Sequence, residues 1–308
     1  MPWYYFWKPP DVGEHVDDRV LSAKLRLGRA DVPSFVELAR ASADAITLSE
    51  MTPDWVRQFD TTGIRTEFSY SVLVPAPGAG GFGLWSRFPL DVVTPMKGGA
   101  MIAARVQIPG MRVEPVIASL HIINPLAFHG KAFEEWRSGI AAAKERMAGL
   151  ADAAGPGAVV VAGDFNSTPD MRQFRDLLIG GYRDAVEQTG AGYAPTFPSY
   201  PLIPPLVTID HVLTRNAGVS SISTIELLGS DHRALLAAVD LARGHSMILS
   251  KLHGSAMSAR DPGWQLPENL GRKGSSADPR GPRPVPYLLV DGVWSVLRFS
   301  FNQNARSG

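Results

Sequence analysis

The chain has 308 residues, of which 45% are hydrophobic, enough for one large domain or two modest ones. Its 30 basic and 30 acidic residues cancel, which argues against strong nonspecific binding to duplex DNA, because such binding depends on Lys and Arg. The sequence contains no cysteine, so disulfides and thiolate metal sites are excluded. No run approaches the roughly 20 apolar residues of a membrane span, and no signal peptide is evident.

Residues 1–18 are expected to form an N-terminal aromatic arm. Residues 1–10 concentrate Trp, Tyr and Phe beside a lysine and three prolines. Two interpretations stay open: an aromatic belt that contacts a membrane interface, or an apolar arm packed on the domain. The expected location is accordingly cytoplasmic or membrane-peripheral.

Residues 19–242 read as one domain that mixes helical crossovers with hairpins. Asp31 is a good N-cap for a helix, and Thr52-Pro53 opens another. We expect helices over 32–42, from 53 onward, over 128–150 and over 170–178. We expect strands at 19–27, 45–49, 67–74, 81–87, 100–108, 113–121, 159–164, 207–213, 221–228 and 234–241. This order indicates two layered sheets with helices outside.

Residues 243–308 form a Gly/Pro-rich tail. Such composition buries too little apolar surface to offset the entropy of ordering, so we expect this tail to be poorly ordered. Only residues 287–301 carry enough apolar side chains for structure, such as a hairpin about Asp291-Gly292.

Polar side chains stand where the expected strands end. The β-branched run from Val159 leads to Gly163 and then to a carboxylate and an amide. A helix N-cap is the simpler interpretation of that one stretch, and both can hold together. Carboxylates suit Mg²⁺ or Mn²⁺, and a histidine beside a carboxylate makes a better base, so the set suits phosphoester hydrolysis. The set comprises Glu50, His121, Asp164, Asn166, Asp210, Asp231 and His232.

Several motifs together resemble the endonuclease/exonuclease/phosphatase superfamily, which includes deoxyribonuclease I. The resemblance runs from about residue 19 to residue 241, and the order of the motifs makes it specific. It implies a four-layered α/β sandwich, with two mixed β-sheets packed face to face and helices outside. The motifs are Leu48-Ser49-Glu50, Gly81 to Leu90, Ser119-Leu120-His121, Gly163-Asp164-Phe165-Asn166, Ile209-Asp210-His211-Val212 and Ser230-Asp231-His232-Arg233.

The resemblance also implies roles for these residues. Glu50 resembles the metal-binding glutamate, and Asp231 would lie near the metal, which is Mg²⁺ or Mn²⁺. Asp210 would orient His232, the expected general base. Asp164 would activate the attacking water, while Asn166 and His121 would contact the phosphate. His211 follows Asp210 in a strand, so its side chain should point to the opposite face and be structural.

Lys24 departs from the family pattern, because members usually carry Asn at the end of the first strand. An ammonium beside Glu50 would compete with a metal ion at about 4 Å, an interaction worth roughly 4 kcal/mol at an effective dielectric near 20. We hypothesise that Lys24 lowers metal affinity. Alternatively, Lys24 binds the substrate phosphate directly.

The function expected is therefore a divalent-metal-dependent phosphoester hydrolase. Its substrate would be a lipid, a small molecule or a nucleic acid, and neutral charge favours the first two. The aromatic start resembles the end of a transmembrane helix in a membrane-attached bacterial branch, so the chain is interpreted as a truncated relative of that branch. A degenerate member that binds a phosphorylated ligand without hydrolysis is the alternative. No protein partner is predicted.

Overall fold

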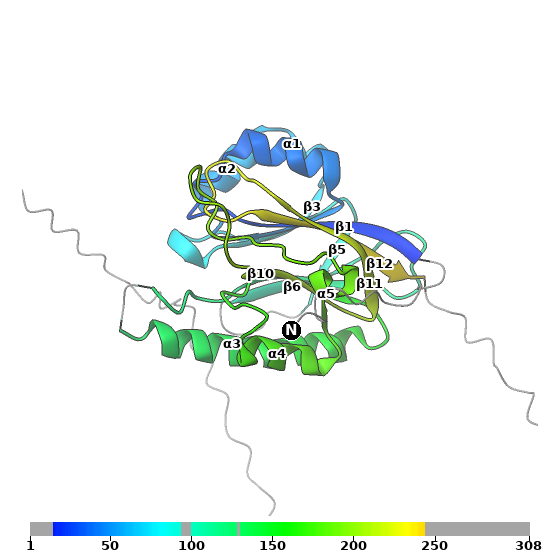
Figure 1. Ribbon diagram of the computed structural model, residues 1–308. Coiled ribbons are helices and arrows are strands. Elements are labelled where there is room, and N and C mark those ends of the chain that lie inside the picture. The colour runs from blue at the N-terminus through cyan, green and yellow to red at the C-terminus, as the bar shows by residue number, and fades with distance from the viewer. Residues whose placement is uncertain (1–14, 94–99, 128–129, 244–308) are drawn as a thin grey trace, which may run out of the picture. The chain divides into compact units, whose positions relative to one another are not determined.

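The structure is a computed structural model that describes residues 15–93, 100–127 and 130–243 (Figure 1). Two mixed sheets of six strands each form its centre. Expectations for residues 1–14 and 244–308, including the membrane-facing arm and the tail hairpin, lie outside the described residues.

The first sheet has the strand order β11-β12-β1-β2-β4-β3. Within it β1 and β2 are parallel, and the other pairs are antiparallel. Its strands are β1 (His15–Lys24), β2 (Ala45–Ser49), β3 (Tyr70–Val74), β4 (Phe82–Ser86), β11 (Ala217–Ile225) and β12 (Ala234–Ala242).

The second sheet has the order β5-β6-β7-β8-β10-β9, and only β7 and β8 are parallel. Its strands are β5 (Leu90–Val92), β6 (Met101–Val106), β7 (Val116–His121), β8 (Val159–Asp164), β9 (Arg183–Asp184) and β10 (Asp210–Arg215).

Helices cover the outer face of each sheet (Figure 1). α1 (Val32–Ser42) and α2 (Pro53–Thr61) pack on the first sheet through a core that includes Phe35, Trp55 and Phe59. α3 (Ala132–Ala154) and α4 (Arg172–Leu177) pack on the second through Trp136 and Phe174. The remaining helices are α5 (Ala185–Thr189) and the 3₁₀ turns η2 (Ile64–Thr66), η3 (Gly78–Gly80) and η4 (Leu178–Gly180).

A third core of small and β-branched residues fills the space between the two sheets, including Val20, Val160 and Val212. The four layers are therefore helices, sheet, sheet and helices, which confirms the predicted sandwich. The caps expected at Asp31 and Thr52 also form, because both side chains accept the N–H three residues on.

Element boundaries differ from the predictions at several places. β1 begins at His15 instead of Arg19, where it pairs with β12. The short elements β5, β9 and α5 were not predicted, since two to five residues carry too little periodicity to read. Among the described residues, no helix has the length and apolarity needed to cross a membrane.

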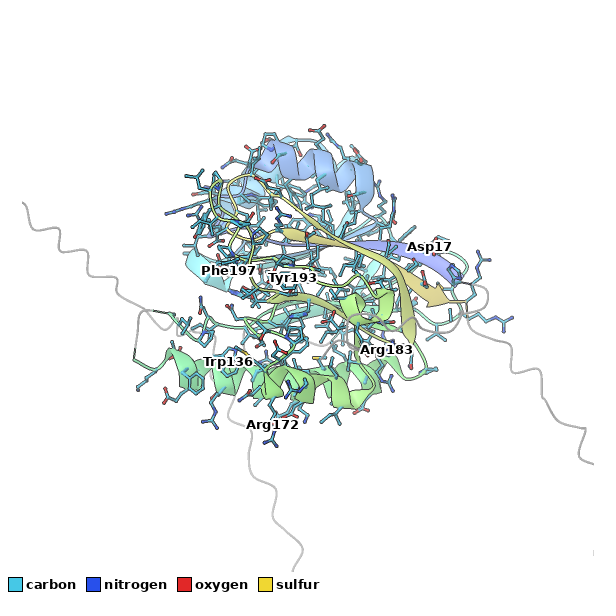
Figure 2. The ribbon with its side chains drawn as sticks, viewed as in Figure 1. Asp17, Trp136, Arg172, Arg183, Tyr193 and Phe197 are labelled. Atoms are coloured by element: carbon cyan, nitrogen blue, oxygen red, sulfur yellow. The ribbon has the colours of Figure 1, made fainter. Side chains whose placement is uncertain are left out.

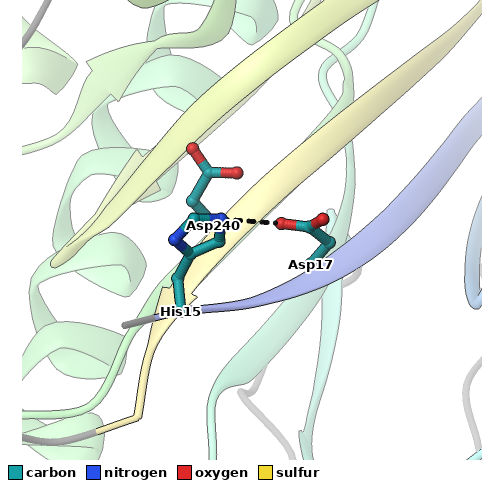
Figure 3. Close-up of side chains that lie close together, drawn as sticks. All are labelled: His15, Asp17 and Asp240. Atoms are coloured by element: carbon teal, nitrogen blue, oxygen red, sulfur yellow. Dashed lines mark ion pairs between the residues drawn. The ribbon is translucent and has the colours of Figure 1, made fainter. Parts of the chain in front are cut away.

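A small polar group lies where β1 begins (Figure 3). Asp17 pairs with Asp240 in the strand register, and His15 Nε2 lies 3.2 Å from Asp17 Oδ1. The ligand atoms of the three residues lie within 4.8 Å of one another, and His15 and Asp17 are exposed. This group stands at the end of β1 opposite Lys24.

Candidate active site

Strand alternation turns the predicted site residues toward the space between the sheets. Val160 packs in the inter-sheet core, and Asp164 follows it by four residues on β8, so both share one face. Asp210 precedes the inter-sheet residue Val212 on β10 in the same way. Residues with the same placement are Lys24 on β1 and His121 on β7.

Gly163 makes the end of β8 possible. Its φ is +150°, and a Cβ atom there would lie 1.9 Å from the carbonyl oxygen of Leu120. No other residue fits this close approach to β7. The glycine therefore sets Asp164 beside His121, its partner in the parallel register.

Asp164 and Asn166 form a rigid buried turn. Asp164 Oδ1 accepts the backbone N–H of Asn166 at 2.8 Å, and Oδ2 accepts its side-chain amide at 3.0 Å. The amide also donates to the carbonyl of Ile122 at 2.7 Å. Trp136 on α3, labelled in Figure 2, donates to the Asn166 carbonyl at 3.1 Å. Asn166 is held at φ 45°, a left-handed conformation that is found where surroundings fix a functional residue.

His232 and Asp210 form a buried pair. Nδ1 of His232 donates to Asp210 Oδ2 at 2.7 Å, so Nε2 faces the rest of the cluster. The hydroxyl of Thr196 accepts the backbone N–H of Asp210 at 3.2 Å. The ring of Phe197, labelled in Figure 2, packs on the imidazole with 4.8 Å between the two ring centroids. Burial opposes the charged imidazolium, but Asp210 and Asp164 outweigh it and raise the pKa of His232.

Lys24 lies at the centre of the cluster. Its Nζ is 2.9 Å from Asp164 Oδ2, 3.3 Å from Glu50 Oε1 and 3.3 Å from His232 Nε2. Only 8% of the residue is exposed. Burial alone would lower the pKa of Lys24, but Asp164 and Glu50 outweigh it and raise that pKa, so the ammonium stays charged. Burial likewise would raise the pKa of Asp164, but Lys24 and His232 hold it at about 2.

His121 faces the same carboxylates. Its Nε2 lies 3.7 Å from both Glu50 Oε1 and Asp164 Oδ2, while Nδ1 donates to the Ala79 carbonyl at 3.2 Å. Burial lowers the pKa of His121, so the ring is neutral near pH 7. With the proton on Nδ1, the lone pair of Nε2 points into the cluster.

Glu50 enters the cluster from the turn after β2, at φ 56°. Its Oε1 faces Lys24, and its Oε2 accepts the N–H of Leu27 at 2.8 Å. Asp231, the second predicted metal ligand, has no hydrogen bond or ion pair to this cluster within the described part of the chain. Its Oδ1 is buried without a partner there. The structure thus joins all predicted site residues except Asp231 into one network of contacts.

The fit of a divalent ion follows from these contacts. Among the described residues, Asp164, Asp210 and His232 place ligand atoms within 4.8 Å of one another and are all buried. Lys24 contacts two of these residues and also Glu50. A carboxylate that already faces an ammonium is a poor metal ligand, so the predicted site on Glu50 does not fit a divalent ion with Lys24 in this position.

His211 points away from the cluster, as predicted. Nδ1 lies 2.7 Å from Asp184 Oδ2, and Nε2 lies 2.9 Å from the Ser167 carbonyl. Both acceptors require N–H donors, so the ring is an imidazolium. Burial opposes this charge, but Asp184 outweighs it and raises the pKa of His211. His211 on β10 is therefore hydrogen-bonded both to β9, through Asp184, and to the loop after β8, through Ser167.

Sequence reasoning assigned no role to three residues that support the site, of which only Ser230 stood in a quoted motif. Thr196 and Phe197 come from the proline-rich loop before β10, where no periodicity marks an inward side chain. Ser230 donates its hydroxyl to the Lys24 carbonyl at 2.7 Å and accepts the N–H of His232 at 3.1 Å. A small hydroxyl residue two positions before the base was the one signal available.

Residues 13–232 match the Endonuclease/Exonuclease/phosphatase family, and the chain belongs to it. No curated protein matches the sequence.

Solved structures share the fold at low identity. One is the 3′ phosphatase NExo from Neisseria bound to a product DNA hairpin (TM-score 0.58, 18% identity, covering 71% of this chain and 98% of that one). Another is D. rerio TDP2 complexed with a single-stranded DNA product (TM-score 0.54, 15% identity, covering 72% of this chain and 98% of that one). A third is beta toxin from Staphylococcus aureus (TM-score 0.51, 14% identity, covering 72% of this chain and 99% of that one).

Proposed function

We propose that the chain hydrolyses phosphoric esters, with His232 as the general base. The buried His232–Asp210 pair carries this proposal, because it places an oriented imidazole beside Asp164 and Lys24 where strands of both sheets end. Family membership and neighbours named as a 3′ phosphatase and as a protein bound to a DNA product agree with ester hydrolysis.

Each residue has a distinct part in the reaction. Asp210 fixes the His232 tautomer with Nε2 toward the cluster. Asp164, ionised and therefore only an acceptor of hydrogen bonds, orients the attacking water. The Lys24 ammonium lies at the same carboxylate and is the donor for the phosphoryl oxygens. Both N–H bonds of the Asn166 amide donate to Asp164 and Ile122, so a contact of Asn166 with the phosphate requires one of these bonds to be exchanged.

The proton and bond changes balance within this set. Water transfers a proton to His232 Nε2 while its oxygen bonds to phosphorus, and the bond from phosphorus to the leaving oxygen breaks. The leaving oxygen keeps the electron pair and is protonated by solvent when its basicity requires it. His121, proposed from the family resemblance to bind phosphate, offers only a lone pair at Nε2 while neutral, so that role requires proton uptake.

The predicted divalent metal would supply Lewis-acid stabilisation of the phosphate when bound. Mg²⁺ or Mn²⁺ on Glu50 and Asp231 was the expectation, but Glu50 faces Lys24 instead. The proton transfer to His232 and the contacts to the phosphoryl oxygens involve the chain's own residues alone.

The substrate class favoured is an ester attached to an apolar group, either a lipid or a small molecule. The chain has no net charge, which argues against a polyanion such as duplex DNA. The side chain of Leu27, whose backbone N–H binds Glu50, is exposed and apolar. Contact of residues 1–10 with a membrane stays a prediction.

Release of p-nitrophenol from bis-p-nitrophenyl phosphate tests the function, in EDTA and with Mg²⁺ or Mn²⁺. Wild type should turn over, His232→Ala should lose activity, and His15→Ala, an exposed histidine at the opposite end of β1, should match wild type. Binding of a non-hydrolysable analogue without turnover by wild type would instead favour the alternative of a non-catalytic phosphate-binding protein.

A further inference from the structure

The ammonium of Lys24 meets three acceptors, one for each of its N–H bonds. They are Asp164 Oδ2 at 2.9 Å, and Glu50 Oε1 and His232 Nε2 at 3.3 Å. Glu50 and Asp164 are 7% and 0% exposed. A buried positive charge thus lies among the groups that otherwise would attract a metal ion.

We propose that Lys24 is the resident cation of this site, which takes the place of a divalent metal and binds the phosphoryl group, so that hydrolysis proceeds without added metal. This inference rests on the proposed hydrolase function.

A metal ion and the ammonium compete for the same oxygen. Mg²⁺ lies about 2.1 Å from its oxygen ligands, so an ion on Glu50 Oε1 would lie no more than about 5.4 Å from the Lys24 nitrogen. The alternative donors Asp164 and His232 are also in contact with Lys24. Each of these donor sets therefore requires two cations to share buried ligands.

The anchoring of Lys24 fits a fixed position in the site. Ser230 Oγ donates to the Lys24 carbonyl at 2.7 Å and accepts the N–H of His232 at 3.1 Å. One hydroxyl therefore ties the end of β1 to the segment before β12 and sets the distance between the cation and the base. The buried stem limits the ammonium to the cluster.

Substrate binding then requires one exchange of hydrogen-bond partner. The N–H that faces His232 Nε2 turns to a non-bridging phosphoryl oxygen, while the other two keep Asp164 and Glu50. His232 Nε2 becomes free to take the proton of the attacking water. As oxygen bonds to phosphorus and the leaving oxygen departs with its electron pair, the ammonium stabilises the added negative charge and is not itself deprotonated.

The test compares wild type with Lys24→Asn, Lys24→Arg and Lys144→Asn. Lys144 is exposed on α3, so its substitution removes the same charge outside the site. Mn²⁺ binding is measured by electron paramagnetic resonance and by the Mn²⁺-induced shift in Tm. Turnover of bis-p-nitrophenyl phosphate is measured in EDTA and in Mn²⁺.

Wild type and Lys144→Asn should turn over equally in EDTA and bind Mn²⁺ weakly. Lys24→Asn should lose at least 100-fold in EDTA, bind Mn²⁺ at least 10-fold more tightly than wild type, and recover activity with Mn²⁺. Lys24→Arg keeps the charge and should bind Mn²⁺ as weakly as wild type, so tighter binding by Lys24→Asn alone would follow from loss of the charge.

Mn²⁺ binding by wild type as tight as by Lys24→Asn, or wild-type turnover that EDTA abolishes, would overturn the inference. Absence of turnover in every protein would defeat the hydrolase proposal instead. In that case the difference in Mn²⁺ affinity between wild type and Lys24→Asn still decides whether Lys24 is the resident cation.

Discussion

The Lys24 ammonium lies 2.9 Å from the Asp164 carboxylate, and this contact joins β1 of one sheet to β8 of the other. The two strands are far apart in the sequence, but their inner faces meet in the core between the sheets. Removing either charge of this ion pair should therefore lower the stability of the fold as well as change the site.

Replacing Lys24 by Met should destabilise the protein. Removing one partner of a buried ion pair typically costs about 3–5 kcal/mol, because the other charge remains buried without compensation. Urea unfolding at pH 7 measures this loss, with Lys144→Met as the surface control expected to change little. A Lys24→Met variant as stable as wild type would show that the ammonium contributes no net stability.

Replacing Asp210 by Asn should reduce turnover while substrate binding changes little. The Nδ1–H of His232 would lose its charged acceptor, and general-base catalysis typically contributes about 10²–10⁴-fold. Steady-state kinetics should therefore show a lower kcat with a similar KM. A change confined to KM would place Asp210 in substrate binding.

The His211–Asp184 pair should make stability depend on pH. The pKa of His211 in the folded protein is raised above its ordinary 6.5. Its contribution is therefore fully present below pH 6.5 and is lost as pH rises through the folded value. The stability gap between wild type and Asp184→Asn should be larger at pH 6 than at pH 9 in urea unfolding. An equal gap at both values would contradict an imidazolium at His211.

Asp18 should also make stability fall as pH rises, here because ionisation of a buried carboxyl is unfavourable. Burial and the nearby Asp44 raise its pKa from 3.8 to about 7, against the effect of Arg19. Unfolding releases this proton, so Asp18 reduces stability as pH rises from 4 to 7. Asp18→Asn should match wild type near pH 4 and exceed its stability by up to about 4 kcal/mol at pH 8. A gain of the same size at both pH values would exclude the titration of Asp18 as its cause.

Hydrophobic patterns predicted most of the long elements, because the helices bury one face and strands such as β2 and β8 are buried along their whole length. Strand alternation also predicted that Asp210 and His211 point to opposite faces, which the structure confirms. The short strands β5 and β9 depend on pairing with partners remote in sequence, and no local pattern marks them.

The site was predictable where a motif closes a strand, as at Asp164, the last residue of β8. Asp210 was expected at a strand end but is the first residue of β10, which reaches the same edge of the sheet because β10 runs antiparallel to β8. The contacts of Thr196 and Phe197 were not predictable, because a proline-rich loop sets no face for its side chains. Lys24 was recognised beside Glu50, but its contacts with Asp164 and His232 depend on how the two sheets approach each other.

Hydrolysis of bis-p-nitrophenyl phosphate in EDTA, by wild type and His232→Ala side by side, tests most directly whether the cluster works as an enzyme with Lys24 as its cation. We predict wild-type turnover at the same rate in EDTA and in Mn²⁺, and a loss of about 10²–10⁴-fold in His232→Ala. Equal rates in the two proteins, or a wild type that is active only with Mn²⁺, would contradict it.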